Sequence, residues 1–441
     1  MTKIRVTIEA RNHDGRGWAQ HAGKNVLVPN AVVGEDVWVE IDRESAKTVQ
    51  GRCVDFIIDK SEETSTCRHL MGCTGCTFLR NDYTSEALFK KRRFQDLLDG
   101  LGESDVPLDF IGPTSPYNYR HYVKLVAERD GNRTLFGSFR RGTHEVTDNV
   151  HCKVLIPELR SLVFSVTESL KNNEMPIFPD EGGLRYLTIR WGRKSKSALL
   201  SLVVVPGGLY SQKAWGKWAL EECEKMESLS GVVCFENDLR TNKILTGEPS
   251  ALAGKPWVEE YIDDYHYRLG ANSFFQINPP MAESMFGYVC DGLSAAKKGV
   301  ELFSGVGALT YPLLSKIQRL WTVELGEEEV AFAHKNEERL GISGVTAIAG
   351  DARKIGPALI RDESPDVLVV DPPRCGMGSE LLQSIQGNSS IQEIALLACQ
   401  PEALKRDFPV LVHAGFRVEK IACVDQFPRT EHYEAVVILK R

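Results

Sequence analysis

Apolar residues recur along the last part of the chain in short blocks, separated by segments of helical length. Four of these blocks cover residues 299–303, 319–323, 366–370 and 394–398. Apolar blocks that alternate with helices predict a parallel sheet covered by helices. Residues 265–441 are therefore expected to form an α/β, Rossmann-like domain. Ligands of such sheets bind where the strands end.

Residues 1–60 show a different pattern, in which short β-type runs are broken by glycines. Residues 25–29 and 36–41 are two of these runs. Their spacing predicts a small antiparallel β-barrel of the OB-like kind. Barrels of this kind often bind oligonucleotides, although the fold alone does not establish that function.

Residues 61–264, between these two regions, mix helix and strand patterns. An amphipathic helix is predicted over residues 84–99, and strands over residues 186–190 and 198–205. This middle segment is expected to form an α+β domain. A multidomain chain suits the length of 441 residues, which exceeds what one hydrophobic core usually supports.

Composition narrows the class of protein. Hydrophobic residues make up 42% of the chain and charged residues 26%, which is typical of a globular protein. No run of about eighteen apolar residues predicts a membrane span, and residues 1–10 lack the apolar core of a secretory signal. The 11 cysteines, an odd and uneven set, fit a reducing compartment better than a disulfide framework. A cytoplasmic protein without membrane contact is therefore expected.

Positive charge is gathered in three runs, although the net charge is −7. A negatively charged chain binds nucleic acid only through local basic surfaces. The three runs indicate such surfaces for RNA, although runs of charge also form ordinary solvated faces. The runs are Lys90, Lys91, Arg92 and Arg93; Arg120, Lys124, Arg129, Arg133, Arg140 and Arg141; and Arg190, Arg193, Lys194 and Lys196.

Acidic residues follow successive strands of the predicted C-terminal sheet. Glu324 ends the second strand, Asp351 follows the third and Asp371 the fourth, while the glycine-containing segment 303–307 follows the first. Each acidic residue alone could be a helix cap. As an ordered series they favour an adenosyl ligand, because a carboxylate accepts hydrogen bonds from ribose hydroxyls. No phosphate-binding Gly-x-x-x-x-Gly-Lys loop accompanies them.

A cysteine and a base are the candidate chemical groups at the same edge. Cys399 lies just beyond the block 394–398, and Cys375 is a rival thiol on the same edge. Glu434 and His432 are both conceivable bases, and sequence alone does not choose between them. Thiolate attack on C6 of uracil makes C5 nucleophilic enough to accept a methyl group, and a base then removes the C5 proton.

Five motifs in a fixed order resemble those of the RNA uracil-5-methyltransferase family, and the resemblance covers nearly the whole chain. They are Phe274-Phe-Gln-Ile-Asn278, Leu302-Phe-Ser-Gly-Val-Gly307, Asp371-Pro-Pro-Arg374, Cys399-Gln-Pro401 and the segment 425–434. The resemblance implies that residues 265–441 are a class I methyltransferase domain that uses S-adenosylmethionine. It also implies a TRAM domain at residues 1–60, as in the ribosomal RNA members.

The resemblance also assigns residues. Cys399 is implied to be the nucleophile and Glu434 the base. The positions implied to contact the donor or to lie beside the target uracil are Gln276, Phe303, Ala308, Glu324, Asp351 and Asp371. Two positions depart from the family pattern: Ala308 replaces the usual asparagine, and Gln400 stands in Ala398-Cys-Gln-Pro401 where the family has Ser-Cys-Asn-Pro. Activity with altered donor affinity is expected.

A second group of cysteines lies before the predicted helix 84–99. Cys67, Cys73 and Cys76 have a spacing that lets thiolates converge on a metal or cluster. By resemblance to the ribosomal RNA members, Cys152 is the fourth ligand of a four-iron, four-sulfur cluster. Zinc is the alternative, because four thiolates also suit its tetrahedral geometry.

The expected product is 5-methyluridine in structured RNA. Ribosomal RNA of the 23S type is preferred because barrel, cysteine group and basic runs resemble its methyltransferases, and transfer RNA is the alternative. A non-catalytic RNA-binding or folding factor of the same architecture is a further alternative. An amine-directed methyltransferase is disfavoured, because Arg374 stands where such enzymes have an aromatic residue after Pro-Pro. The sequence names no protein partner.

Overall fold

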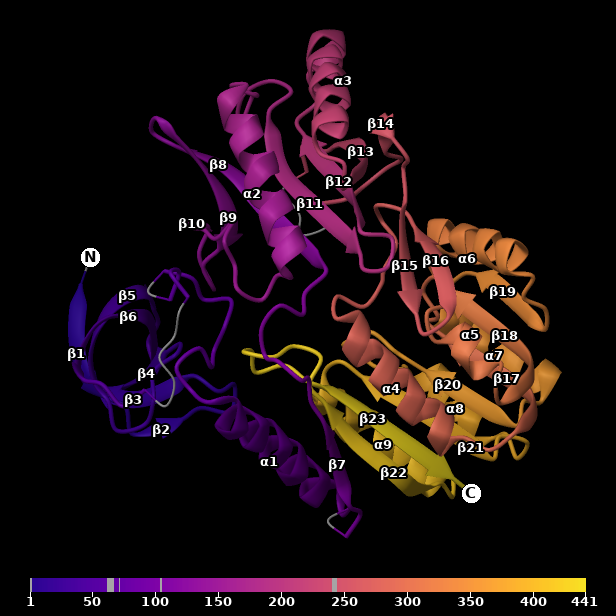
Figure 1. Cartoon of the computed structure of the whole chain (residues 1–441). Coiled ribbons are helices and arrows are strands. Elements are labelled where there is room, and N and C mark those ends of the chain that lie inside the picture. The colour runs from indigo at the N-terminus through magenta and orange to yellow at the C-terminus, as the bar shows by residue number, and fades with distance from the viewer. Residues whose placement is uncertain (1, 62–66, 71, 104, 240–243) are drawn as a thin grey trace.

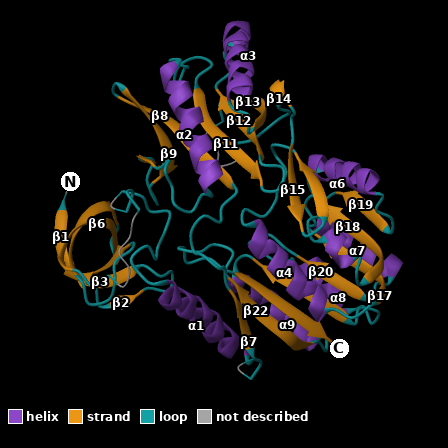
Figure 2. Cartoon of the chain, in the orientation of Figure 1, coloured by secondary structure: helices purple, strands orange, loops and turns teal. Residues whose placement is uncertain are grey.

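Residues 2–61, 67–70, 72–103, 105–239 and 244–441 are described in the computed structural model, without the side chains of residues 208–211 (Figure 1). The described strands form three larger sheets and one two-stranded hairpin. Figure 2 shows that the N-terminal part of the described chain is built of strands, whereas strands and helices alternate in the C-terminal part.

The C-terminal sheet has eight strands in the order β19-β18-β17-β20-β21-β23-β22-β7. Strands β19, β18, β17, β20 and β21 run parallel to one another, and β23 is antiparallel to β21 and β22. Val369 and Leu368 belong to different core clusters, so both faces of the sheet are buried. The predicted Rossmann-like sheet is confirmed. Its strands are β17 (Ala296–Leu302), β18 (Ile317–Glu324), β19 (Val345–Ala349), β20 (Val367–Val370), β21 (Glu393–Ala398), β22 (Arg417–Val424), β23 (Glu434–Lys440) and β7 (Leu108–Ile111).

Helices cover both faces of this sheet (Figure 1). They are α4 (Pro279–Gly292), α5 (Thr310–Leu313), α6 (Glu327–Leu340), α7 (Ala352–Glu363), α8 (Ser379–Gln386) and α9 (Leu404–His413), with a short 3-10 helix at Pro401–Ala403. Helix α1 (Tyr83–Leu101) joins them, because it packs against α9, β22 and β7.

Strand β7 departs from the domain pattern expected from the sequence. It lies within the segment 61–264 that was expected to form the middle domain, yet it pairs in parallel with β22. Together with α1 it belongs to the layers of the C-terminal sheet. The boundaries after residues 60 and 264 stay predictions.

The middle sheet has seven strands in the order β10-β9-β8-β11-β12-β13-β14. Helices α2 (Pro157–Asn172) and α3 (Gly208–Lys225) share a core with one face of this sheet. The other face, through Leu199, Val203 and Val233, belongs to the same core cluster as α4 and β23. The middle and C-terminal regions are therefore packed together. The strands are β8 (Tyr122–Asp130), β9 (Arg133–Phe139), β10 (Val146–Asp148), β11 (Leu184–Gly192), β12 (Ser197–Val204), β13 (Leu229–Glu236) and β14 (Ser250–Gly254), and the hairpin is β15 (Val258–Ile262) with β16 (Tyr265–Leu269).

The N-terminal sheet has six strands in the order β1-β5-β6-β4-β3-β2 and curves around a small core that includes Val26 and Val39 (Figure 1). Strands β1 and β2 stand at the two ends of this order, so a closed barrel is not confirmed. The strands are β1 (Lys3–Thr7), β2 (Ala10–Arg11), β3 (Gly17–His21), β4 (Lys24–Val28), β5 (Asp36–Glu44) and β6 (Thr48–Ile58). Among the described residues, no helix combines the length and the apolar character that crossing a bilayer demands.

Candidate active site

Strand register brings Cys399 and Glu434 together. Strands β21 and β23 are antiparallel, and Ala398 at the end of β21 faces Ala435 near the start of β23. Cys399 follows Ala398 and Glu434 precedes Ala435, so the two side chains meet at the same edge of the sheet. Cys399 is half-buried and Glu434 is buried. The two residues predicted to be nucleophile and base are therefore neighbours.

The surroundings of Cys399 keep its thiol protonated in the unliganded protein. Burial raises the pKa of Cys399 to about 11, and the negative charges of Glu434 and Asp371 add to the effect, while Arg374 opposes it. A thiolate is the nucleophilic form of cysteine. The thiol therefore needs a partner that favours loss of its proton, and the guanidinium of Arg374 is such a group.

The carboxyl groups at this edge raise the pKa values of their neighbours. Burial and the charge of Asp371 raise the pKa of Glu434 to about 8. Burial and the charge of Glu324 raise the pKa of Asp371 to about 6. A base whose pKa lies near neutrality is well suited to proton transfer. The same group of carboxyls favours a ligand that carries positive charge.

The loop after β17 is braced by Glu324. Its carboxylate accepts hydrogen bonds from the N–H of Gly305 at 2.9 Å and from the N–H of Gly326 at 3.0 Å. Phe303 begins the loop with a φ of 67°, and Gly305 follows with a φ of 57°. A non-glycine residue in this left-handed region costs free energy and is typical of functional sites. The loop therefore holds a fixed shape at the end of its strand.

The other residues expected to contact the donor lie around this loop. Asp351 caps α7 by accepting a hydrogen bond from the N–H of Arg353 at 3.0 Å, so the structural role considered for it is present. The carbonyl of Ala308 accepts from the hydroxyl of Tyr267 at 3.1 Å. Gln276 accepts from the side chain of Gln426 at 3.4 Å, which joins the motif 274–278 to the segment 425–434.

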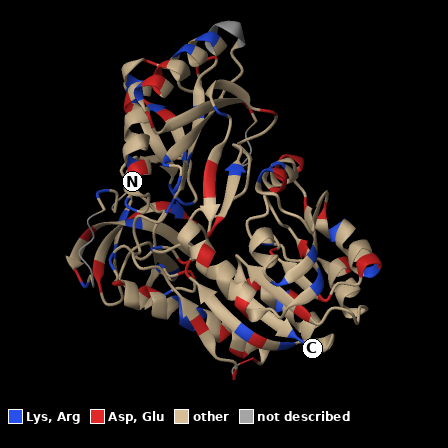
Figure 3. Cartoon of the chain, turned by 45° about the vertical axis from the view of Figure 1, so that its right-hand side comes forward, with Lys and Arg blue, Asp and Glu red and all other residues tan. Residues whose placement is uncertain are grey.

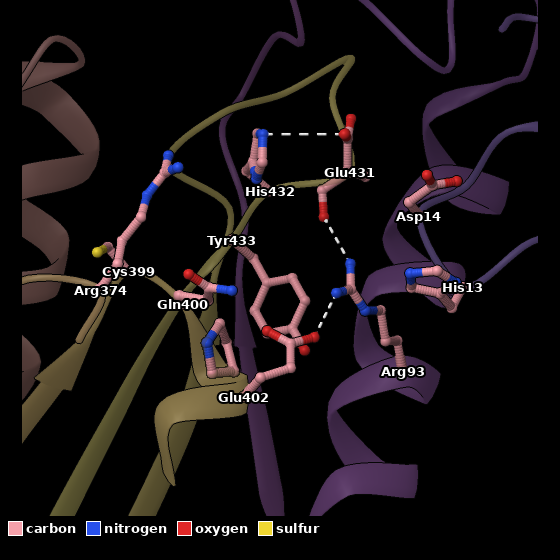
Figure 4. Close-up of a pocket in the computed structure, with 11 residues that line it drawn as sticks. His13, Asp14, Arg93, Arg374, Cys399, Gln400, Glu402, Glu431, His432 and Tyr433 are labelled. Atoms are coloured by element: carbon pink, nitrogen blue, oxygen red, sulfur yellow. Dashed lines mark hydrogen bonds and ion pairs between the residues drawn. The ribbon is translucent and has the colours of Figure 1, made fainter. Parts of the chain in front are cut away.

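A pocket with a volume of about 270 Å³ opens beside Cys399 (Figure 4). Its wall comes from three parts of the chain: the edge of the C-terminal sheet, α1 and the turn between β2 and β3. The lining residues are His13, Asp14, Arg93, Arg374, Cys399, Gln400, Pro401, Glu402, Glu431, His432 and Tyr433. Sequence analysis missed the contribution of His13 and Asp14, and Arg93 was visible only as a member of a basic run.

Cys375 and His432, the rivals considered for nucleophile and base, are placed differently. Cys375 is exposed, does not line this pocket, and accepts a hydrogen bond from Arg353 at 2.7 Å. His432 is exposed and lines the pocket. Because strand register sets Glu434 directly beside Cys399, the geometry favours Glu434 as the base.

The first basic run is only partly exposed, because Lys91 and Arg92 lie at the surface whereas Lys90 is buried and Arg93 is paired. Lys90 is fully buried and donates to Glu86 at 2.7 Å and to Asp425 at 2.8 Å. Burial opposes its charge, but the carboxylates of Asp425 and Glu86 raise the pKa of Lys90. Arg93 forms an ion pair with Glu402. The expectation of an RNA surface is wrong for Lys90, because its charge is neutralised inside the fold.

The other two basic runs also contain ion pairs with acidic residues of the same protein, some of them at the surface, and Figure 3 shows acidic residues interspersed among the basic ones. Arg193 of the third run pairs with Glu283 at 2.5 Å, and Arg190 donates to the carbonyl of Ser273 at 2.6 Å. Pairs in the second run are Arg129 with Asp180, Arg133 with Asp130, Arg140 with Glu145 and Arg141 with Glu431. Arg190 and Arg193 therefore hold parts of the fold together, whereas the pairs of Arg129 and Arg133 are exposed.

The cysteines expected to hold a cluster lie near one another without forming a ligand set. Burial raises the pKa of Cys76, and the charges of Cys152, Cys73 and Cys67 add to the rise, which places the four thiols in one neighbourhood. Within the described ranges, however, no group of three or more His, Cys, Asp or Glu side chains is arranged to hold a metal ion. The residues in this arrangement do not fit the predicted iron–sulfur cluster or zinc, so that prediction is not supported.

The order of the C-terminal sheet, the loop after β17 and the side chains of Cys399, Glu434 and Asp371 at the strand ends define a methyltransferase of the Rossmann-like class. The crystal structure of Pyrococcus abyssi tRNA (uracil-54, C5)-methyltransferase in complex with S-adenosyl-L-homocysteine has the same fold. It superposes with a TM-score of 0.76 over 99% of this chain and 100% of that chain, at 22% sequence identity.

Residues 257–441 match the model of the tRNA (uracil-5-)-methyltransferase family. Similar full-length proteins are uncharacterized RNA methyltransferases. The one of Caldanaerobacter subterraneus subsp. tengcongensis is 28% identical over 100% of this chain and 98% of its own length. Those of Clostridium acetobutylicum and Synechocystis are each 28% identical over 99% of this chain, and over 96% and 95% of their own lengths. Residues 257–441 thus match the uracil-5-methyltransferase family that the motifs resemble, and the prediction of a methyltransferase is confirmed.

Proposed function

We propose that this protein transfers a methyl group from S-adenosylmethionine to C5 of a uracil in RNA and so forms 5-methyluridine. The observation that carries the proposal is the placement of Cys399 beside Glu434 at the edge where Asp371 and Glu324 also lie. The match of residues 257–441 to the family model and the name of the Pyrococcus abyssi protein, which states uracil C5 as its target, support the same reaction.

The donor site is proposed at the ends of β17 and β18. Both oxygens of Glu324 accept one backbone hydrogen bond each and keep lone pairs for the two ribose hydroxyls. Carboxyls at this edge suit a cationic sulfonium, because burial and the charges of neighbouring carboxyls raise the pKa values of Asp371 and Glu434, and a cation beside them favours their charged forms. The further donor contacts proposed are Gln276, Phe303, Ala308, Asp351 and Asp371.

The reaction follows from the thiol and the carboxyl. Cys399 loses its proton to water and its thiolate adds to C6 of uracil, which makes an enolate whose C5 takes the methyl group from the sulfonium. The donor leaves as the neutral thioether. The carboxylate of Glu434 then removes the proton from C5, and the C6–S bond breaks to release the thiolate. Arg374 stabilises the thiolate form through its positive charge.

Structured RNA is the proposed substrate, with 23S ribosomal RNA preferred and transfer RNA as the second candidate. An N-terminal β-sheet module of the TRAM or OB-like kind suits a structured RNA. The name of the Pyrococcus abyssi protein supports transfer RNA equally. We place the reaction in the cytoplasm.

Purified protein, radiolabelled S-adenosylmethionine and total RNA from cells that lack the protein test the proposal. The expected product is labelled 5-methyluridine, and mapping it in ribosomal and transfer RNA identifies the substrate. Cys399→Ala, which lacks the proposed nucleophile, is the control and is expected to be inactive. Label in any other nucleoside, or equal label with Cys399→Ala, contradicts the proposed reaction. Binding of RNA without any methyl transfer supports the non-catalytic alternative.

A further inference from the structure

The pocket beside Cys399 is closed on one side by the N-terminal sheet. His13 and Asp14 belong to the turn between β2 and β3 and line the pocket together with Cys399 and Arg93. Figure 4 shows both side chains across the pocket from Cys399. A turn near the start of the chain therefore forms one wall of a pocket whose reactive groups lie near its end.

Internal contacts give this turn one shape. The N–H of Asn12 donates to the carbonyl of Arg16 at 2.8 Å, and the N–H of Gly15 donates to the carbonyl of Asn12 at 2.9 Å. The guanidinium of Arg16 donates to Asp14 at 2.8 Å. Gly15 has a φ of 80°, and a Cβ at this position would lie 2.6 Å from the ring of Phe78. Only glycine lets the turn approach Phe78 this closely.

A buried ion pair fixes the N-terminal sheet beside the pocket. Arg80 donates to Glu35 through two nitrogens at 2.7 and 2.5 Å, and both side chains are buried. Asn30 donates to the carbonyl of Cys76 at 3.1 Å and accepts from the N–H of Leu79 at 2.9 Å. Separation would leave a buried charge unpaired, which is costly. The folded structure itself therefore holds His13 at the pocket.

The contacts around His13 leave it able to bind a ligand. Nδ1 lies 2.9 Å from Oδ1 of Asn12, and Nδ2 of Asn12 donates to Asp14 at 3.3 Å. This orientation of Asn12 makes Nδ1 the donor, so that in the neutral ring Nε2 is a hydrogen-bond acceptor. The neighbouring charges are already paired, Asp14 with Arg16 and Arg93 with Glu402. A flat ring with one acceptor suits a nucleotide, since RNA-binding proteins stack bases on such rings and contact the 2′-hydroxyl.

We propose that His13 binds the nucleotide next to the target uridine. Its ring stacks on that base, or its Nε2 accepts a hydrogen bond from the ribose 2′-hydroxyl, while the uridine itself lies at Cys399. The N-terminal sheet thereby selects the RNA strand around the target from within the active-site pocket. This inference rests on the proposed methyl transfer to RNA.

The test compares His13→Ala with His21→Ala, an exposed histidine of β3 outside the pocket lining. Both variants and the wild type are assayed on total RNA from cells that lack the protein, over a range of RNA concentrations. His13→Ala is expected to raise KM for RNA about tenfold, as loss of one base contact does, with kcat nearly unchanged. His13→Phe keeps the flat ring and is expected to recover part of the loss. His21→Ala is expected to behave as the wild type.

Failure of this inference can be distinguished from failure of the proposed function. If the wild type is active and His13→Ala has the same KM for RNA, the inference is overturned and the proposed function stays intact. The same holds if His13→Ala changes kcat alone. A wild type that makes no 5-methyluridine overturns both. Equal melting temperatures of His13→Ala and the wild type exclude unfolding as the cause of a raised KM.

Discussion

The edge of the C-terminal sheet and the segment of residues 67–93 both contribute to the candidate site, but different contacts hold their residues in place. At the sheet edge, main-chain pairing of β21 with β23 sets Cys399 beside Glu434. In the segment 67–93, side chains reach partners far along the chain, because Lys90 bonds Asp425, 335 residues away. The first region carries the proposed reactive groups, and the second braces the loop that leads to Glu434.

The brace consists of buried polar contacts to the segment 425–434. Besides the bond from Lys90, Tyr83 donates to Asp425 at 2.9 Å, and the hydroxyl of Thr77 donates to Glu431 at 2.7 Å. Breaking a buried network leaves charges unpaired, so such contacts resist change strongly. Substitutions at the sheet edge should therefore remove chemistry without unfolding, whereas substitutions in the brace should lower stability.

Cys399→Ala is expected to have the largest effect on activity. Loss of the nucleophile should lower the single-turnover rate of methyl transfer about 10⁴-fold or more, because Cys399 is the only one of the described cysteines that lines the pocket. Cys375→Ala is the control and should keep the wild-type rate. The opposite result, with Cys375→Ala inactive and Cys399→Ala active, would place the nucleophile on the loop after β20.

Glu434→Gln keeps the shape of the side chain and removes the base. Steady-state turnover is expected to fall about 10²- to 10⁴-fold, which is the usual contribution of a positioned general base. His432→Gln serves as the comparison, and its turnover should stay close to that of the wild type. Initial rates under saturating RNA and donor measure both. A greater loss in His432→Gln than in Glu434→Gln would reverse the assignment of the base.

Lys90→Met probes the brace rather than the chemistry. Removal of this buried ammonium leaves Glu86 and Asp425 facing each other, so the free energy of unfolding should fall by about 3–5 kcal/mol. Lys91→Met, at an exposed neighbour, should change it by less than about 0.5 kcal/mol. Urea denaturation followed by tryptophan fluorescence gives both values. Equal stability of the two variants would show that Lys90 does not brace the loop.

The pH dependence of turnover has the smallest expected effect. Burial raises the pKa of Glu434 to about 8, so the carboxylate that accepts the C5 proton is the minor form at neutral pH. The elimination step should therefore become faster by up to about tenfold per pH unit below pH 8 and then level off, while loss of the Cys399 proton, with a pKa of about 11, favours the attack on C6 further above pH 8. Because the folded pKa lies above the unfolded one, the neutral carboxyl stabilises the fold at low pH and this stabilisation is lost as pH rises through about 8. A rate that falls between pH 6 and pH 8 contradicts this role.

The sequence predicts the sheet edge because strand order and local pattern determine it. Apolar blocks such as 366–370 form strands, and the residues that follow them, including Asp371 and Cys399, necessarily meet at one edge of a parallel sheet. The choice between Glu434 and His432 required the register of β21 and β23. Register depends on contacts between strands, which a single sequence does not state.

The brace and the pocket wall were not predictable in the same way. A run of four basic residues on a helix indicates a solvated face, and only the fold shows that Lys90 points inward to Glu86 and Asp425. The short strand β7 joins the C-terminal sheet only because the edge of β22 is free to pair with it. His13 reaches the pocket because the N-terminal sheet is docked by the ion pair of Arg80 with Glu35. These contacts join residues that are distant in sequence.

The mass of the Glu434→Gln protein after incubation with RNA and S-adenosylmethionine tests the central claim most directly. With the base removed, methyl addition to C5 proceeds while elimination stalls, so the protein should carry a covalent RNA adduct that survives denaturation and contains the transferred methyl group. Glu434→Gln combined with Cys399→Ala should carry none. An adduct that persists in the double variant, or no adduct in Glu434→Gln while the wild type methylates RNA, contradicts covalent catalysis by Cys399.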